Sequence, residues 1–166
     1  MFSIDVSNLH WMEGTSEEED LCLHGNAIAK IGNETFAYEA TVSSTALYLL
    51  KSLKDDHKIY ESNQMLPCCG FFMIANDDLS KVDICGCPEG IDWSVHHENE
   101  NIVLTTDSGN ITTIIKKEYQ KEVFSFADKI EKFYHKSKPK IIPTNDFDKN
   151  GYIAFWNEWK SIRYQK

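Results

Sequence analysis

The chain has 166 residues, of which 42% are hydrophobic and 12% aromatic, and its formal net charge is −9. This composition is typical of a globular protein and excludes a disordered one, and the length predicts one domain, residues 1–166, with its own hydrophobic core. No apolar run reaches the roughly 20 residues that a membrane helix requires, and the amino end shows no signal segment, so we expect a cytoplasmic protein without a membrane partner.

The negative charge is concentrated in the first part of the chain. Residues 1–100 contain eighteen Asp and Glu and five Lys, whereas residues 101–166 contain eight Asp and Glu and twelve Lys and Arg. Charge governs solubility and association rather than fold, so this asymmetry is the clearest functional signal in the sequence. It favours a basic protein as the partner and disfavours nucleic acid, because an acidic surface repels phosphate.

Short strand patterns and polar turns alternate at the start of the chain. Residues 2–6 alternate as a strand does, and residues 14–20 have the composition of a solvated acidic loop. Further strand patterns lie at residues 21–24, 27–31 and 35–40. Because Gly32 and Asn33 tolerate left-handed backbone conformations, we expect an antiparallel hairpin between the last two.

Two apolar segments follow. Apolar residues recur every three or four positions over residues 43–54, which predicts a helix with its N-cap among residues 42–44. Residues 66–74 are an uncharged apolar run of strand length, and they predict a central strand that is covered on both faces.

The rest of the chain predicts a meander and two more helices. Strand patterns separated by turn residues lie at 82–87, 91–96, 102–106 and 110–115. The helical period over residues 116–137 predicts a long amphipathic helix that ends before Pro139, and residues 152–162 predict a terminal helix. The sequence therefore predicts an α+β fold, in which a mainly antiparallel sheet of hairpin plus meander is covered by about three helices.

The five cysteines lack the spacing of a disulfide framework, which favours free thiols in a reducing compartment. Adjacent strand residues point to opposite faces, so Cys68 and Cys69 cannot both join a zinc site on a regular strand. The remaining candidate metal ligands are Cys85, Cys87, Cys22 and His24. Buried structural thiols are the favoured interpretation, and no cofactor is expected.

Residues 146–153 match the beginning of a calcium-binding loop, with oxygen donors at Asp146, Asp148 and Asn150. The bidentate carboxylate that normally closes such a loop is missing, because Asn157 stands in its place. The favoured interpretation is a polar turn in which Asp148 or Asn150 caps the terminal helix.

Two acidic clusters provide the candidate partner-binding residues, which are Glu17, Glu18, Glu19, Asp77 and Asp78. A charge run alone can be a solvated face that limits aggregation. Summed over a hundred residues, however, the excess lowers stability through self-repulsion unless a cationic surface offsets it. We therefore expect these carboxylates to steer a basic partner toward the protein.

Three blocks, at residues 66–70, 85–93 and 147–156, resemble a small, functionally uncharacterised family of bacterial cytosolic proteins. The resemblance implies a bacterial cytosolic protein but no activity and no site residues. In size, acidity and lack of a catalytic motif, the chain is also similar to immunity proteins of bacterial toxin systems, whose folds vary. The sequence thus favours a non-enzymatic acidic binding protein, an immunity protein that neutralises a cationic toxin or nuclease.

Two alternatives stay open. The first is a metal-binding protein or small enzyme that uses Cys85, Cys87 and a neighbouring His. The second is a domain that associates with itself through its aromatic residues, so the oligomeric state is open.

Overall fold

The computed structural model describes residues 1–61, 63–70 and 72–165. In chain order its elements are β1 (Phe2–His10), β2 (His24–Ile31), β3 (Glu34–Ala40), α1 (Val42–Lys51), β4 (Leu66–Pro67), β5 (Phe72–Ala75), β6 (Val82–Cys85), β7 (Gly90–Ile91), β8 (Trp93–Glu98), β9 (Asn101–Thr106), β10 (Ile111–Ile115), α2 (Lys116–Lys136) and α3 (Asp146–Arg163). The strands of the described residues form antiparallel sheets with the orders β1-β2-β3, β10-β9-β8, β4-β7 and β5-β6. The predicted α+β fold with a hairpin, a meander and three helices is confirmed for these residues, with the strands divided among small sheets.

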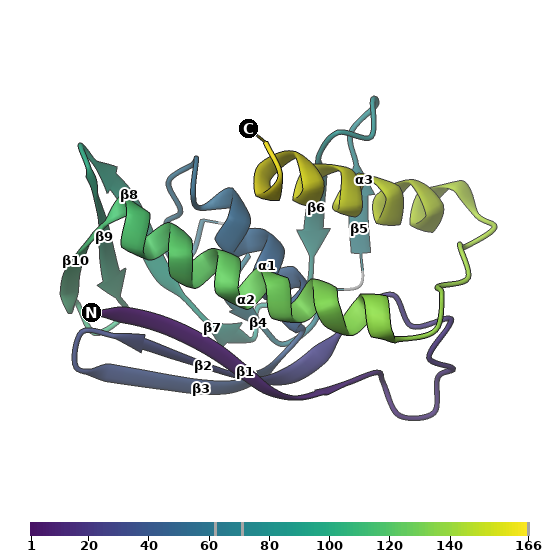
Figure 1. The fold of residues 1–166 in the computed structure, drawn as a ribbon, viewed down its shortest axis with the longest axis horizontal. Helices are drawn as coiled ribbons and strands as arrows, with labels where there is room; N and C mark the ends of the chain where they lie inside the picture. Colours follow the sequence, from purple (N-terminus) through teal and green to yellow (C-terminus); the bar gives the residue numbers. More distant parts are fainter. Residues whose placement is uncertain (62, 71, 166) are drawn as a thin grey trace.

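Strand β1 of the N-terminal sheet packs against the long helix α2, and the two lie side by side in Figure 1. The predicted hairpin joins β2 to β3, and Gly32 provides its turn with φ +62°. Strand β1 is longer than predicted, and its register shifts between Ser7 and His10, where Asn8 has φ +51°. The Phe2 ring lies 5.0 Å from that of Tyr119 on α2, so aromatic packing joins the two layers.

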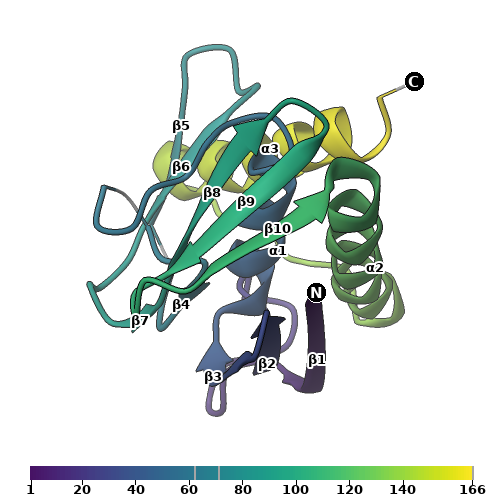
Figure 2. The same ribbon diagram turned by 90° about the vertical axis from the view of Figure 1, so that its left-hand side faces the viewer.

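Strands β8, β9 and β10 form a meander from three of the four predicted segments, and β10 leads directly into α2 (Figure 2). The other predicted segment, residues 82–87, pairs with β5 instead, as β6. The Trp93 side chain at the start of β8 is fully buried. Its ring lies 6.4 Å from Phe2 and 6.4 Å from Phe36, which belong to the N-terminal sheet. The core is thus continuous between the two three-stranded sheets.

Helix α1 lies at the centre of the molecule, against α2, α3 and strands β2 and β4. It begins at Val42 with Thr41 as N-cap, and no side chain caps it. Ser43, one of the predicted caps, lies inside the first turn, where its hydroxyl accepts the Leu23 N–H over 3.1 Å. A helix that is buried on nearly all sides gains most of its stability from packing rather than from capping.

The predicted central strand over residues 66–74 is wrong. The segment is divided into β4 and β5, and residue 71 lies outside the described residues. Phe72 is 62% exposed and Ile74 is 43% exposed, so β5 is covered on one face only. Gly70 lies against α1, where an added Cβ would be 2.5 Å from the Ser44 hydroxyl. Residues 68–70 therefore pass the helix without forming a strand.

Helix α3 begins at Asp146, earlier than predicted, so residues 146–151 are its first turns and form no calcium loop. Its N-cap is Asn145, which accepts the Asp148 N–H over 2.9 Å, so the predicted caps are wrong. Asp146 and Asp148 in the first turn favour this helix end because their charges oppose the positive end of the helix dipole. No helix of the described residues is both long and apolar enough to span a bilayer.

Candidate functional site

The outer face of the β5–β6 hairpin presents apolar and acidic side chains to solvent. Residues that pair across an antiparallel ladder point to the same face, and here Phe72 pairs with Cys85 and Ile74 with Asp83. All four are exposed, while the opposite face of the hairpin is buried in the core. We define the hairpin surface as these residues together with the acids of the hairpin tip: Phe72, Ile74, Asp77, Asp78, Asp83 and Cys85.

The tip of the hairpin holds two of the predicted partner-binding acids in a fixed turn. Asp77 and Asp78 are both exposed. The Asp78 carboxylate accepts the Ser80 hydroxyl at 2.5 Å and the Ser80 N–H at 3.0 Å, and these hydrogen bonds lower its pKa. On the helix side, the Asn157 amide donates to the Leu79 carbonyl at 2.9 Å. The tip is therefore anchored to α3, and Asp78 stays ionised near neutral pH.

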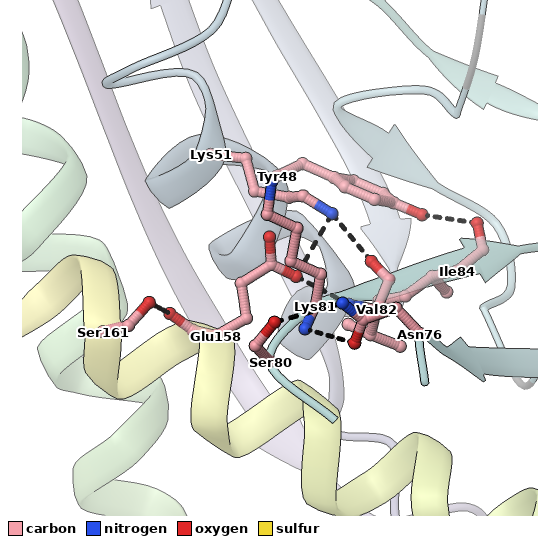
Figure 3. A network of polar contacts seen from close by, with 9 residues as sticks. All are labelled: Tyr48, Lys51, Asn76, Ser80, Lys81, Val82, Ile84, Glu158 and Ser161. Carbon is pink, nitrogen blue, oxygen red and sulfur yellow. Dashed lines mark hydrogen bonds and ion pairs between the residues drawn. The ribbon is translucent and has the colours of Figure 1, made fainter. Parts of the chain in front are cut away.

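Side chains from α1 and α3 occupy the outer edge of β6, where a neighbouring strand would otherwise pair (Figure 3). Lys51 Nζ donates to the Val82 carbonyl at 2.7 Å, and Glu158 Oε2 accepts the Val82 N–H at 2.8 Å. Tyr48 donates to the Ile84 carbonyl at 3.1 Å. An unpaired edge invites association through backbone hydrogen bonds. Because these groups are already bonded, the outer edge of β6 is not available to pair with a strand of another molecule.

An ion pair joins the two helices at this edge. Lys51 Nζ lies 3.3 Å from Glu158 Oε2, and the Glu158 side chain is only 7% exposed. A buried carboxylate needs both a cation and hydrogen-bond donors, and it has them here in Lys51 and in the Val82 N–H. The position of the hairpin relative to α1 and α3 depends on this network.

The other predicted acids lie on the loop that precedes β2. Glu17 Oε1 accepts the Lys138 N–H at 2.8 Å, and its carbonyl accepts Lys140 Nζ. The Glu18 carbonyl accepts the Ile141 N–H at 2.8 Å. Glu17 and Glu18 thus contact the basic segment that connects α2 to α3. The sequence contains the signal for this pairing, since both segments are short and opposite in charge.

Glu19, in contrast, lies close to the hairpin surface. It lines a hollow of about 370 Å³ with Phe72, Met12, Pro143 and Asp148. Phe72 is at the base of the hairpin and the Asp77–Asp78 turn is at its tip. The structure therefore places Glu19 and the two tip aspartates at opposite ends of an exposed apolar strip.

The candidate metal ligands are not brought together as one set. Cys85 lies on the hairpin surface, whereas Cys87 belongs to the loop that follows β6. Cys22 is buried and donates to the Gly70 carbonyl at 3.7 Å, and burial raises its pKa to about 12. His24 begins β2, with its ring 5.9 Å from that of His10. Within residues 1–61, 63–70 and 72–165, no three Cys, His, Asp or Glu side chains are arranged to hold a metal ion.

The structure also reveals a histidine and aspartate cluster that the sequence analysis missed. Asp56 Oδ2 lies 2.6 Å from His96 Nδ1, and Asp56 Oδ1 lies 2.7 Å from His97 Nδ1. Nearby, His57 Nε2 lies 2.8 Å from Asp92 Oδ1, which also accepts the Met65 N–H. These two sets of contacts join the segment after α1 to strand β8 and to Asp92, which directly precedes it. Their partners are about forty positions apart in the chain, so no local motif indicates them.

The Asp56 cluster predicts a measurable acid dependence of stability. Hydrogen bonding from His97, and then from His96, lowers the pKa of Asp56 to about 2. Because its pKa is lower in the folded state, Asp56 stabilises the protein near neutral pH, and this contribution is lost as the pH falls from about 4 to 2. The side chain is 42% exposed, so we expect Asp56→Asn to lower the free energy of unfolding at pH 7 by at most about 1 kcal/mol.

Urea unfolding at pH 7, 4 and 3 checks this expectation. The difference between wild type and Asp56→Asn should shrink as the pH falls. The neighbouring exposed variant Asp55→Asn is the matched control and should show little difference at any of these pH values. A difference for Asp56→Asn that does not change with pH would contradict the expectation.

Comparisons with protein-family models, with curated proteins and with solved structures give no match for this chain. The hairpin surface brings exposed apolar and acidic groups together and is the candidate functional site.

Proposed function

We propose that this protein is a non-enzymatic binding protein that holds a basic protein partner on the hairpin surface. The observation that carries the proposal is the exposure of Phe72 and Ile74 side by side, between Glu19 at one end and Asp77 and Asp78 at the other. The acidity of the chain and its similarity to immunity proteins favour a cationic toxin or nuclease as the partner.

The composition of this surface suits recognition of a cationic protein. Stable interfaces have an apolar centre with a polar rim, and large aromatic side chains in the centre supply much of the affinity. Phe72 would provide such an anchor, and Asp77, Asp78 and Asp83 would form the rim. With a net charge of −9, the whole molecule would also accelerate the approach of a positively charged partner.

The support beneath the surface favours binding without rearrangement. Glu158, Lys51 and Tyr48 hold the β6 backbone, and Asn157 holds the tip. A surface that is already ordered loses little conformational entropy when it binds, so more of the contact energy is available as affinity.

Site-specific cross-linking in the native cell tests the surface and the charge of the partner together. A photoreactive amino acid at Ile74 should form an adduct with a basic protein. The same residue at Ile111, which is 68% exposed on β10, is the matched control and should not. Adducts at both positions, adducts with an acidic protein, or adducts with a second copy of this chain would contradict the proposal.

Binding kinetics with the captured partner then separate charge from anchoring. The triple variant Asp77→Asn, Asp78→Asn, Asp83→Asn should associate about threefold to tenfold more slowly at low salt, with a weaker salt dependence. Phe72→Ala should raise the dissociation rate about tenfold or more. A charge-matched control, Glu98→Gln, Glu100→Gln, Glu118→Gln, should change the association rate much less. Equal effects of the two triple variants would show that no particular surface is involved.

A further inference from the structure

Three thiols gather at the base of the β5–β6 hairpin. The β4–β7 and β5–β6 ladders hold residues 68–70 beside residues 86–89. The Cys68 N–H donates to the Glu89 carbonyl at 3.1 Å, and the Cys87 N–H donates to Cys69 Sγ at 3.0 Å. Because the chain bends at Cys68, the thiols of both Cys68 and Cys69 reach Cys87. The opposite orientation of adjacent cysteines applies to a regular strand and not to this bend.

Gly86 keeps the two segments in contact. A Cβ at this position would lie 2.2 Å from the Cys69 carbonyl oxygen and 3.4 Å from Cys69 Sγ. Such a distance to a backbone atom is not compatible with any side chain, so only glycine allows this approach. The Cys87 sulfur is joined through Cβ and Cα to the nitrogen that already contacts Cys69 Sγ. Rotation of the two side chains can therefore bring the sulfurs together without a large backbone shift.

The three thiols differ in acidity. The pKa of Cys87 is lowered, because its sulfur accepts hydrogen bonds from the Cys69 thiol, the Glu89 N–H and the Cys68 thiol. The pKa of Cys68 is raised, chiefly because it donates to Cys87. For Cys69 the Cys87 N–H acts in the lowering direction, but burial and donation to the Cys87 thiol outweigh it. Cys87 is thus the thiol that ionises first within the cluster.

We propose that Cys87 and Cys69 form a reversible disulfide when the protein meets hydrogen peroxide. The Cys87 thiolate attacks one peroxide oxygen and the O–O bond breaks, which leaves a sulfenic acid and, after protonation, one water. The Cys69 thiol then attacks the Cys87 sulfur, the S–O bond breaks, and a second water leaves as the S–S bond forms. Two thiols are oxidised and one peroxide is reduced.

The negative charge of the protein favours a neutral oxidant over an anionic one. Hydrogen peroxide is neutral, so it is not repelled by a chain with net charge −9 or by Glu89 beside Cys87. An anionic disulfide such as oxidised glutathione would be repelled. The bond would join the two segments that flank the hairpin and would close its base, whether or not the hairpin surface binds a partner.

Mass spectrometry of the reduced wild-type protein tests the proposal. Treatment with a small excess of hydrogen peroxide should lower the intact mass by about 2 Da, for the two hydrogens lost, and dithiothreitol should restore it. Peptide mapping should identify a Cys69–Cys87 bond. The melting temperature should rise by roughly 5–10 °C, because the bond closes a loop in the unfolded chain.

Serine variants assign the roles. Because Cys68 also reaches Cys87, the double variant Cys68→Ser, Cys69→Ser should stop at a sulfenic acid on Cys87 that dimedone traps. Cys87→Ser should be oxidised at least about tenfold more slowly than wild type. Cys85→Ser is the matched control, since Cys85 is exposed but lies on the hairpin surface, and it should oxidise like wild type. The wild-type peptide map requires no variant to fold. A Cys68–Cys69 bond, a bond to Cys85, or oxidation at the same rate in Cys87→Ser would overturn the proposal.

Discussion

Glu158→Ala is expected to lower the free energy of unfolding by about 3 kcal/mol, which corresponds to a fall in melting temperature of roughly 6–12 °C. The substitution removes the buried carboxylate that accepts the Val82 N–H and pairs with Lys51. It leaves a backbone donor at the β6 edge without its acceptor and a partly buried ammonium without its counter-ion. Breaking one member of a buried pair is more harmful than replacing both members, because the remaining charge is uncompensated.

Further variants separate the charge of Glu158 from its hydrogen bond. Glu158→Gln keeps an acceptor for Val82 but not the charge, so it should lose about half as much stability. In a double-mutant cycle with Lys51→Ala, a coupling of about 1 kcal/mol or more is expected. Glu118→Ala, at an exposed position on α2, should stay within about 0.5 kcal/mol of wild type. Losses for Glu158→Ala that resemble this control would show that the network does not hold the hairpin.

Gly151→Ala is expected to destabilise the protein by about 2–3 kcal/mol, although alanine favours a helix over glycine by about 1 kcal/mol. Gly151 is buried where α3 crosses β5. A Cβ there would lie 2.0 Å from the Met73 carbonyl oxygen and 2.8 Å from the Met73 carbonyl carbon. Both are backbone atoms, so the clash can be relieved only if the helix moves away from the strand. The sign of the change therefore reports on the contact between α3 and β5.

Thermal and urea unfolding of Gly151→Ala measure this effect. Lys160→Ala, at an exposed position of the same helix, controls for helix propensity and should be within about 0.5 kcal/mol of wild type. Amide hydrogen exchange should also accelerate in β5 of Gly151→Ala before it does in β9, because α3 packs against β5. A gain in stability, as propensity alone predicts, would contradict the close approach.

The sequence predicts secondary structure correctly where an element has one buried face and one exposed face, because the period of its apolar residues then reveals its type. The helical period of α2 and the alternation of the meander strands have this property, and both predictions are confirmed. The segment 66–74 does not, because a continuous apolar run is also compatible with an exposed ribbon. Only the contact of Gly70 with α1 and the packing of α3 on one face of β5 decide between them. These are long-range contacts that no local window contains.

The candidate site was only partly predictable for the same reason. Asp77 and Asp78 follow from composition, since acidic residues in a turn are exposed. The sequence predicts Phe72 and Ile74 in the core, because an apolar residue in a strand pattern is usually buried, but both are exposed. Glu158 carries no local signal as a support for β6. Its role depends on a pairing with Val82 across 76 positions.

That separation has a consequence for how the protein matures on the ribosome. The hydrogen-bond acceptor for Val82 is added to the nascent chain 76 residues after Val82 itself, a delay of about 4–15 s at ordinary rates of translation. During this interval the exposed aromatic ribbon has been synthesised but lacks its support from α3. The hairpin surface thus reaches its supported conformation only after α3 has been synthesised, and chaperones have a defined interval in which to shield Phe72.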